Sequence, residues 1–212
     1  MLSAAIRAPK SKHRTFNNYL TGVVILLGLY IIVTPILPNI NFWLKKKVDH
    51  NQGYKYKSNL TKNEAPEDVK RDIANLPDPP NKRLYIPSMQ LDAEVFEGSN
   101  ANTLNKGVWR RPKTSTPDKG GNTVLVAHRF DYNGPAVFYH LDVLKNGDKF
   151  AVFWNGKEYD YQVTEVKVVE PTAIEIENNT TEPTLTLYTC TPMWTAKQRL
   201  VVVAKLVSET AI

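Results

Sequence analysis

Cys190 is the only cysteine among the 212 residues, and it stands at the end of an apolar run, TLTLYTC. A structural cysteine more often lies among apolar neighbours in the middle of a strand, whereas Cys190 closes one run and opens a polar loop. A thiol attacks a carbonyl as the thiolate, which a neighbouring base can generate. The position of Cys190 therefore favours a nucleophile, and an incidental free thiol is the alternative.

His128 is the best placed base in the sequence. It ends a second apolar run, NTVLVAH, as Cys190 ends its own, so two adjacent strands could present both side chains at one end of a sheet. His13 and His50 flank the apolar N-terminal segment, and His140 lies in VFYHLDVL, which is typical of a short helix. We expect His128 to be the general acid/base, and a hydrogen-bonded histidine at a strand end is the alternative.

Arg199 begins the next apolar run, RLVVVAKL, after the loop TPMWTAKQ. A tight return of the chain would bring it beside Cys190. A guanidinium stays charged and donates several hydrogen bonds, so it can stabilise an oxyanion or hold a substrate carbonyl. Arg110, Arg111 and Arg129 are rivals, but each lies in a predicted loop. A surface arginine at a strand start is the alternative for Arg199.

Four residues near the nucleophile are candidates for substrate binding. Thr189, and the backbone amide of Thr191, can donate to an oxyanion or to the substrate. Met193 and Trp194 would form apolar walls for a substrate side chain, and simple packing within the loop is the alternative.

Residues 83–212 must form the fold that brings these side chains together. Their apolar residues follow the pattern of β-strands, without helical periodicity. RLYIPS and LDAEVFEG predict two strands around a turn, and NANTLNKGV predicts a helical turn. Further strands are expected in NTVLVAH, VTEVKVVEP, TAIEIENN, EPTLTLYTC and QRLVVVAKLV. About eight strands with no covering helix must close on themselves, which predicts an all-β barrel or sandwich.

One predicted hairpin joins KFAVFW to KEYDYQVT across Asn155-Gly156, the two-residue signal of a type I′ turn. Alternation in its second strand predicts a core face and a solvated face. The core face would carry Tyr159, Tyr161 and Val163, and the solvated face Asp160, Gln162 and Thr164.

The first 82 residues have a different organisation. Residues 1–18 are basic, and residues 19–37 form an apolar run that as a helix would be roughly 28 Å long, enough to span a bilayer core. No small-x-small cleavage pattern follows the run, so an uncleaved signal anchor is favoured over a secretory signal. Residues 38–82 are a polar linker rich in Pro, Asn and Lys, with a short helix expected over 66–76.

Charge is divided unevenly between these regions. Residues 1–82 hold 13 Lys and Arg against 6 Asp and Glu, whereas residues 83–212 hold 14 against 15. A nucleic-acid-binding protein would concentrate positive charge on its folded domain, so that function is disfavoured. The basic excess suits the surface of an anionic membrane or wall polymer.

The sequence resembles the sortases, membrane-anchored cysteine transpeptidases of bacterial surfaces. The resemblance spans residues 83–207 and is carried by TLYTC, by RLVVVA after a short loop, by GGNTVLVAHR and by LYIPSMQLDAEVFEG. It implies a closed eight-stranded β-barrel, with Cys190 as nucleophile, His128 as general acid/base and Arg199 holding the oxyanion or substrate. Many members have glycine where this chain has Ala127, which could alter the backbone approach of the substrate there.

The resemblance also implies a reaction and a location. Cys190 would cleave an LPXTG-like sorting signal between Thr and Gly, form a thioester and pass the protein to an amine acceptor of the cell wall. The domain of residues 83–212 would lie outside the bacterial membrane, with the N-terminus inside. The TCTP continuation is similar to class D and E members, and wall anchoring is favoured over pilus assembly because no aromatic residue follows Asp78-Pro79.

Three alternatives accompany this reading. Some sortases bind calcium through carboxylates, but alternating acidic residues are more typical of a solvated strand face, so no cofactor is expected. The acidic residues concerned are Glu94, Glu97, Glu175 and Glu177. An L,D-transpeptidase would also be a Cys/His/Arg β-protein of the wall, although Cys190 lacks its Ser-His-Gly flank. A non-catalytic, membrane-anchored binding barrel is the remaining alternative.

Overall fold

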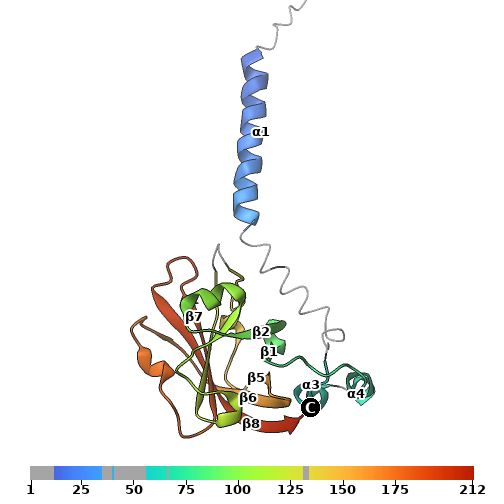
Figure 1. The fold of residues 1–212 in the computed structure, drawn as a ribbon. Helices are drawn as coiled ribbons and strands as arrows, with labels where there is room; N and C mark the ends of the chain where they lie inside the picture. Colours follow the sequence, from blue (N-terminus) through green and yellow to red (C-terminus); the bar gives the residue numbers. More distant parts are fainter. Residues whose placement is uncertain (1–11, 35–39, 41–55, 66, 131–133) are drawn as a thin grey trace, which may run out of the picture. The chain divides into compact units, whose positions relative to one another are not determined.

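The computed structural model describes residues 12–34, 40, 56–65, 67–130 and 134–212 (Figure 1). The chain divides into two compact units, Met1–His50 and Asn51–Ile212. The first contains the apolar helix and the second contains the sheet.

Helix α1 spans Lys12–Val33. Its segment Phe16–Val33 has a mean hydropathy of 1.8 and is long and apolar enough to cross a membrane, a property that signal sequences share. The amide of Thr34 closes the last turn on the carbonyl of Tyr30 at 3.0 Å, and Pro35 follows, which has no amide hydrogen to continue the helix. The predicted span reaches residue 37, and its last residues, 35–37, lie outside the described residues.

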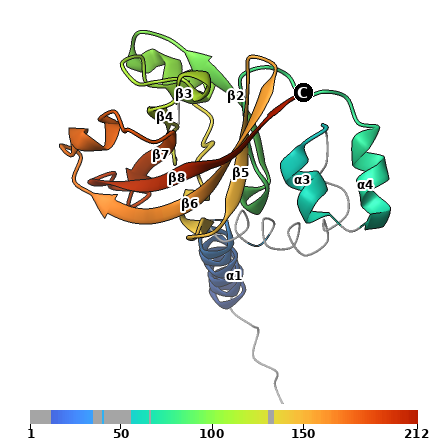
Figure 2. The same ribbon diagram turned by 90° about the horizontal axis from the view of Figure 1, so that it is seen from below.

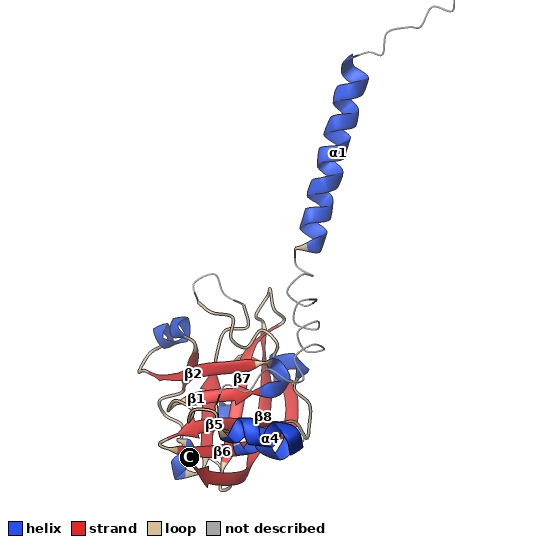
Figure 3. Cartoon of the chain, turned by 90° about the vertical axis from the view of Figure 1, so that its right-hand side faces the viewer, coloured by secondary structure: helices blue, strands red, loops and turns tan. Residues whose placement is uncertain are grey.

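The described part of the second unit contains eight strands, which close into a barrel in the order β1-β2-β3-β4-β7-β8-β6-β5 (Figures 1 and 3). Their bounds are β1 Arg83–Ile86, β2 Leu91–Glu97, β3 Val108–Arg110, β4 Asn122–Val126, β5 Lys149–Trp154, β6 Lys157–Val169, β7 Thr184–Thr191 and β8 Gln198–Ala211. The pairs β2–β3 and β4–β7 are parallel and the other pairs are antiparallel. The prediction of an all-β barrel is confirmed, with a mixed sheet.

Five short 3₁₀ helices lie in the described connections of the barrel: η1 Pro87–Met89, η2 Ala101–Lys106, η3 Pro117–Lys119, η4 Leu141–Val143 and η5 Ile174–Glu177. The predicted helical turn before Trp109 is η2, and η1 forms the predicted turn between the first two strands. These elements connect strands at the ends of the barrel, and the barrel wall consists of the strands.

Alternation along the strands fills the barrel interior. Successive strand residues point to opposite faces, and the inward positions carry the apolar side chains. In β7 the inward residues are Leu185 and Leu187, both fully buried, and in β4 Leu125 is buried in the same cluster. The predicted core face of β6 is confirmed, since Tyr159, Tyr161 and Val163 are at most 2% exposed.

The predicted hairpin between β5 and β6 is present, with φ of 51° at Asn155 and 75° at Gly156, as a type I′ turn requires. Two other predictions were wrong. TAIEIENN forms η5 rather than a strand, because it pairs with no neighbour and leaves Ile174 80% exposed. KEYDYQVT and VTEVKVVEP form one strand, β6, whose pairing with β8 shifts register between Asp160/Tyr161 and Val163/Glu165.

Two short helices precede the barrel, α3 over Asn59–Glu64 and α4 over Glu67–Ala74, and they lie side by side next to β5 (Figure 2). Leu60 of α3 packs on Ala151 and Phe153 of β5, and Ile73 of α4 is 1% exposed. Residues 56–80 thus include segments packed on the barrel, which their polar composition does not indicate.

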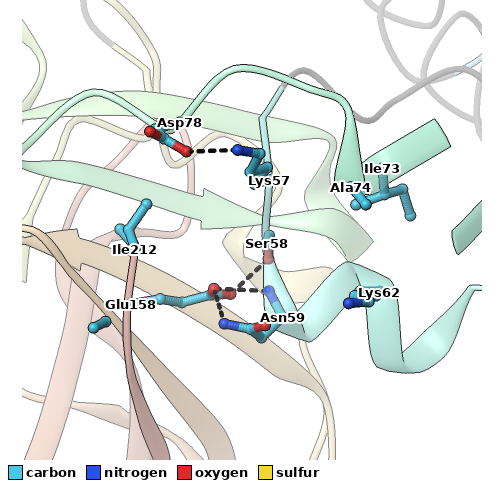
Figure 4. Close-up of a pocket in the computed structure, with 10 residues that line it drawn as sticks. Lys57, Ser58, Asn59, Lys62, Ile73, Ala74, Asp78, Glu158 and Ile212 are labelled. Carbon is cyan, nitrogen blue, oxygen red and sulfur yellow. Dashed lines mark hydrogen bonds and ion pairs between the residues drawn. The ribbon is translucent and has the colours of Figure 1, made fainter. Parts of the chain in front are cut away.

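Glu158 of β6 fixes α3 to the barrel (Figure 4). Its carboxylate accepts hydrogen bonds from the Ser58 hydroxyl at 2.6 Å, the Asn59 amide at 2.7 Å and the Leu60 amide at 3.1 Å. A carboxylate here also complements the positive end of the helix dipole. A cavity of about 270 Å³ adjoins this contact, lined in part by Lys57, Asp78 and the C-terminal Ile212.

The face of β6 that was expected to be solvated is buried at this end, which corrects the sequence prediction. Asp160 is 4% exposed and Glu158 is 1% exposed. Burial, together with the charge of Glu158 and a hydrogen bond to it, raises the pKa of Asp160 to about 7, and the Ser208 hydroxyl bound at 2.6 Å opposes this shift. The Asp160 carboxyl therefore holds its proton up to near neutral pH.

Candidate active site at the ends of β4, β7 and β8

Cys190 and Arg199 lie directly opposite each other in the antiparallel ladder of β7 and β8. Direct partners in such a ladder project to the same face with their Cβ atoms about 5 Å apart. The face is the outer one, because the neighbouring residues Thr189 and Leu200 alternate with them and Leu200 belongs to the interior cluster. The β7–β8 hairpin therefore places a thiol and a guanidinium side by side on the barrel surface.

His128 lies two residues beyond the end of β4, which runs parallel to β7. The last residue pair of this ladder is Val126 with Tyr188, and the Thr189 hydroxyl donates to the Ala127 carbonyl at 2.8 Å, which continues the same offset. The next residues in that offset are His128 and Cys190. Ala127 is part of the interior cluster, so the alternation assigns His128 to the outer face that carries Cys190.

The guanidinium of Arg199 is fixed by its own loop. Its Nη1 donates to the carbonyls of Ala196 and Gln198, each at 3.0 Å. These bonds hold the charge at the loop end of the β7–β8 hairpin. The predicted placement of Arg199 at a strand start is found, one residue after the beginning of β8.

The rival cations have other partners in the structure. Arg110 binds Glu97 at 2.7 Å, and Arg111 binds Glu177 at 2.8 Å. Arg129 is 9% exposed and donates to Thr191 and Asp142. Each of these guanidinium groups is thus held by a carboxylate.

His140 precedes η4 and stacks edge-on against Tyr139 with ring centroids 4.8 Å apart. Burial lowers the pKa of His140, and the Arg129 charge acts in the same direction, against the charge of Asp142. This environment favours the neutral imidazole. It is poorly suited to stabilising an imidazolium beside a thiolate.

The residues expected to bind substrate differ in burial and in their partners. Thr189 and Ala127 are buried and bonded to each other, so they support the site from within. Trp194 is 68% exposed and Met193 is half-buried in the loop between β7 and β8, where the Trp194 ring packs edge-on against Phe130 at 4.6 Å. Thr191 is half-buried and accepts a hydrogen bond from Arg129.

Tyr188, Glu177 and Arg111 form a cluster on the same outer face, which sequence reasoning missed. The Tyr188 hydroxyl donates to Glu177 at 2.7 Å, and the same carboxylate oxygen accepts from Arg111. Burial and this carboxylate raise the pKa of Tyr188, while the Arg111 and Arg199 charges oppose the shift. The cluster fixes η5 against the barrel, and no local motif marks it because its members come from three separate segments.

Asn105 of η2 is a second residue that the sequence analysis did not single out. Its side-chain oxygen lies 3.4 Å from Nε2 of His128. The β2–β3 connection therefore contributes a polar group next to the candidate base. The signal in the sequence is only an asparagine in a polar segment.

The carboxylates considered for calcium are dispersed. Glu97 is bonded to Lys82 and Arg110, and Glu177 to Arg111 and Tyr188. Among the described residues no group of three or more His, Cys, Asp or Glu side chains is arranged to hold a metal ion.

A model of the sortase domain matches residues 84–207 of the chain. The chain belongs to the sortase family. Sortases are cysteine transpeptidases, and the matched residues include every strand from β1 to β7 in full or nearly so, together with the site at the ends of β4, β7 and β8. The resemblance seen in the sequence is confirmed.

Similar proteins carry several sortase names. Sortase A of Bacillus anthracis is 32% identical over 129 residues, which are 61% of this chain and 60% of that protein. Sortase D of Bacillus subtilis is 28% identical over 131 residues, which are 59% of this chain and 63% of that protein. The chain thus spans less than two thirds of the length of these two sortases, and the similar proteins include sortases A, D and E.

The fold agrees with solved sortases. The structure of sortase A from Listeria monocytogenes superposes with a TM-score of 0.55 at 26% sequence identity, over 61% of this chain and 88% of that one. The aligned share corresponds in size to the barrel. The closed eight-stranded barrel is therefore the sortase fold.

Proposed function

We propose that this chain is a transpeptidase that uses Cys190 as nucleophile, His128 as general acid/base and Arg199 as the cation for the oxyanion or substrate. The substrate class is a surface protein with a C-terminal LPXTG-like sorting signal. The acceptor is an amine of the cell wall, such as a peptide precursor. No cofactor takes part in the steps assigned to these residues.

The observation that carries the proposal is the pairing of Cys190 with Arg199 across β7 and β8. A thiolate and a developing oxyanion both gain from a fixed positive charge a few ångströms away. Because the pair is set by backbone register, its two side chains are already on one face before substrate arrives. Such preorganisation is what electrostatic stabilisation of an acyl-transfer transition state requires.

The first half of the reaction forms a thioester. The Cys190 sulfur, having given its proton to His128, attacks the Thr carbonyl carbon of the sorting signal, and the carbonyl oxygen becomes an oxyanion facing Arg199. The tetrahedral intermediate collapses as the Thr–Gly C–N bond breaks. His128 protonates the departing amine, so the acyl group remains on sulfur.

The second half reverses these roles. The acceptor amine attacks the thioester carbonyl, and His128 removes the proton that the amine loses. The C–S bond breaks, the new amide bond joins the protein to the acceptor, and the thiol is regenerated. His128 thus acts as base and then as acid in each half: it takes a proton from Cys190 and gives it to the leaving amine, then takes one from the acceptor amine and returns it to the Cys190 sulfur.

We further propose that α1 anchors the protein in the bacterial membrane, with the N-terminus inside and residues 83–212 outside. The support is the length and apolar character of Phe16–Val33. A sorting signal with its own apolar tail would then be held at the same membrane surface as the enzyme.

The test uses the full chain purified in detergent and a panel of LPXTG-like peptides with a small amine. Mass spectrometry of the products should show cleavage after Thr and transfer of the N-terminal part to the amine. The Cys190→Ala chain should do neither. If the two chains behave alike on the whole panel, the transpeptidase assignment is lost.

A further inference from the structure

Arg129 connects the residue after the candidate base with the residue after the candidate nucleophile. It directly follows His128, and its Nη1 donates to the hydroxyl of Thr191, which directly follows Cys190, at 2.9 Å. Its Nη2 donates to Asp142 at 2.6 Å. The side chain is buried, so this arrangement is part of the packed structure.

The backbone alone does not set the spacing of His128 and Cys190. On its β8 side, β7 is held by the ladder as far as Thr191. On its β4 side, the ladder stops at Val126 and Tyr188. The candidate base and nucleophile therefore lie past the last backbone pair between their own two strands.

Two side-chain hydrogen bonds continue the register where the ladder stops. The Thr189 hydroxyl donates to the carbonyl of Ala127, and these are the residues just before Cys190 and His128. Arg129 donates to Thr191, and these are the residues just after them. Both bonds keep the residue offset of the β4–β7 ladder. They lie on either side of the position at which the His128 and Cys190 side chains are expected to meet.

Asp142 fixes the far end of the Arg129 guanidinium. Its carboxylate belongs to η4, which lies downstream of His128, and the charge-assisted bond restricts where Nη1 can point. The Phe138 amide also donates to the His128 carbonyl at 3.0 Å, so the segment before η4 is bonded to His128 and η4 itself to Arg129. The planar guanidinium can reach Thr191 and Asp142 at once, which a lysine ammonium cannot reproduce.

We propose that Arg129 is a positioning residue that sets the distance between His128 and Cys190. The inference rests on the proposed function of these two side chains. Arg129 itself touches neither substrate nor reacting atoms in this assignment. It acts by holding Thr191, and through it the backbone of the nucleophile, against the end of β4.

The test is the pH dependence of Cys190 alkylation by iodoacetamide in the full chain, without substrate. The chain has one cysteine, so the reaction reports this thiol alone. Arg129→Met and Thr191→Val should both move the midpoint of the alkylation curve to higher pH, because the base no longer lies at the right distance. Thr191→Val keeps the Arg129 charge, so its shift separates geometry from charge.

Turnover of an LPXTG-like peptide is the second readout. Arg129→Met should lower kcat by about 10- to 100-fold with little change in KM, the size of effect expected from a misplacement of about 1 Å. Arg129→Lys should restore only part of this loss. The double variant Arg129→Met/Thr191→Val should be no slower than Arg129→Met, because both substitutions remove the same Arg129–Thr191 hydrogen bond.

Arg83→Met is the matched control. Arg83 is half-buried and, like Arg129, paired with an aspartate, Asp92 at 2.6 Å, but it lies on β1 rather than at the candidate site. It should lower the melting temperature without changing the alkylation curve. The proposal is overturned if Arg129→Met behaves like this control, or if the two losses at Arg129 and Thr191 simply add.

The proposed function and the role of Arg129 can be contradicted separately. A wild-type chain that cleaves no peptide contradicts the proposed function, but the alkylation curves still report the spacing of the two side chains. Wild-type turnover with unchanged curves in Arg129→Met and Thr191→Val contradicts the role of Arg129 alone.

Discussion

Cys190 and Arg199 are direct partners in the ladder between β7 and β8, and both project from the outer face of the barrel. The pairing converts two residues that are separated by a loop into a fixed thiol–guanidinium unit. The loop carbonyls of Ala196 and Gln198 hold one end of the guanidinium, so its position does not depend on substrate.

Replacement of Arg199 should affect the transition state more than substrate binding. Arg199→Ala removes the fixed charge and is expected to reduce kcat/KM by about 10²- to 10³-fold, the range seen when an oxyanion donor is lost. Arg199→Lys should recover part of the rate, because an ammonium restores charge without the planar donor pair. Steady-state kinetics with one peptide compares the three chains, and equal rates for wild type and Arg199→Ala would remove Arg199 from the site.

Trp194 tests whether the β7–β8 loop binds substrate. The ring is largely exposed and contacts Phe130, so its removal should leave the melting temperature within a few degrees of wild type. If the ring forms an apolar wall for the substrate, Trp194→Ala should raise KM several-fold, about 1 kcal/mol of lost apolar contact. An unchanged KM over a panel of peptides would assign Trp194 to loop packing.

The candidate site could largely be predicted from the sequence because its members are tied to strand ends. The apolar runs that stop at His128 and Cys190 mark the ends of β4 and β7 to within two residues, and the next run locates Arg199. The contacts that were missed, those of Asn105, of Arg129 and of the Tyr188–Glu177–Arg111 cluster, join segments that are distant in the sequence. No local periodicity reports such contacts.

Most strands of the fold could likewise be predicted, because each has a local pattern of apolar residues. Apolar or alternating runs indicated β1, β2, β4, β5, β7 and β8, and two such runs together form β6, whereas β3 is only Val108–Arg110 and too short for a pattern. The alternation in TAIEIENN resembles a strand, yet its apolar positions find no core to pack on. Burial of Glu158 and Asp160 could not be foreseen because their partners, Ser58 and Ser208, come from the segment before the barrel and from the end of β8.

Glu158 should matter for stability and not for turnover. Its carboxylate receives the N-terminal amides of α3, whereas the end of β6 that pairs with Arg199 is Val169, roughly 35 Å away along an extended strand. Glu158→Gln puts a side-chain NH₂ group where a carboxylate oxygen accepts from these backbone amides. It should therefore lower the free energy of unfolding by about 2–3 kcal/mol. Denaturant unfolding measures this loss, and hydrogen exchange should increase in residues 59–64.

The corresponding activity measurement provides the contrast. The Glu158→Gln chain should retain kcat within about twofold below its melting temperature. A loss of turnover as large as that of Arg199→Ala would mean that α3 docking acts on the active site.

Asp160 should make stability fall as pH rises through the weakly acidic range. Its pKa is raised in the folded chain, to about 7, so the folded state binds a proton more tightly than the unfolded state does. The stabilisation is full below the ordinary carboxyl pKa near 4 and is lost as pH increases toward 7, with a slope of at most ~1.4 kcal/mol per pH unit.

Asp160→Asn tests this dependence. The amide oxygen can still accept from Ser208, and the side chain does not titrate. The free energy of unfolding of wild type relative to Asp160→Asn, measured by denaturant at several pH values, should decrease between pH 4 and pH 7 and then level off. A difference that is constant with pH, or that increases, would contradict the raised pKa of Asp160.

The most direct test of the account is the intact mass of the full chain after mixing with an LPXTG-like peptide in the absence of an amine acceptor. We predict a mass gain equal to the peptide's N-terminal part up to Thr, located on Cys190, removed by neutral hydroxylamine and absent from Cys190→Ala. Cleavage of the peptide by Cys190→Ala, or an acyl adduct on any other residue, would contradict the assignment of Cys190 as the nucleophile.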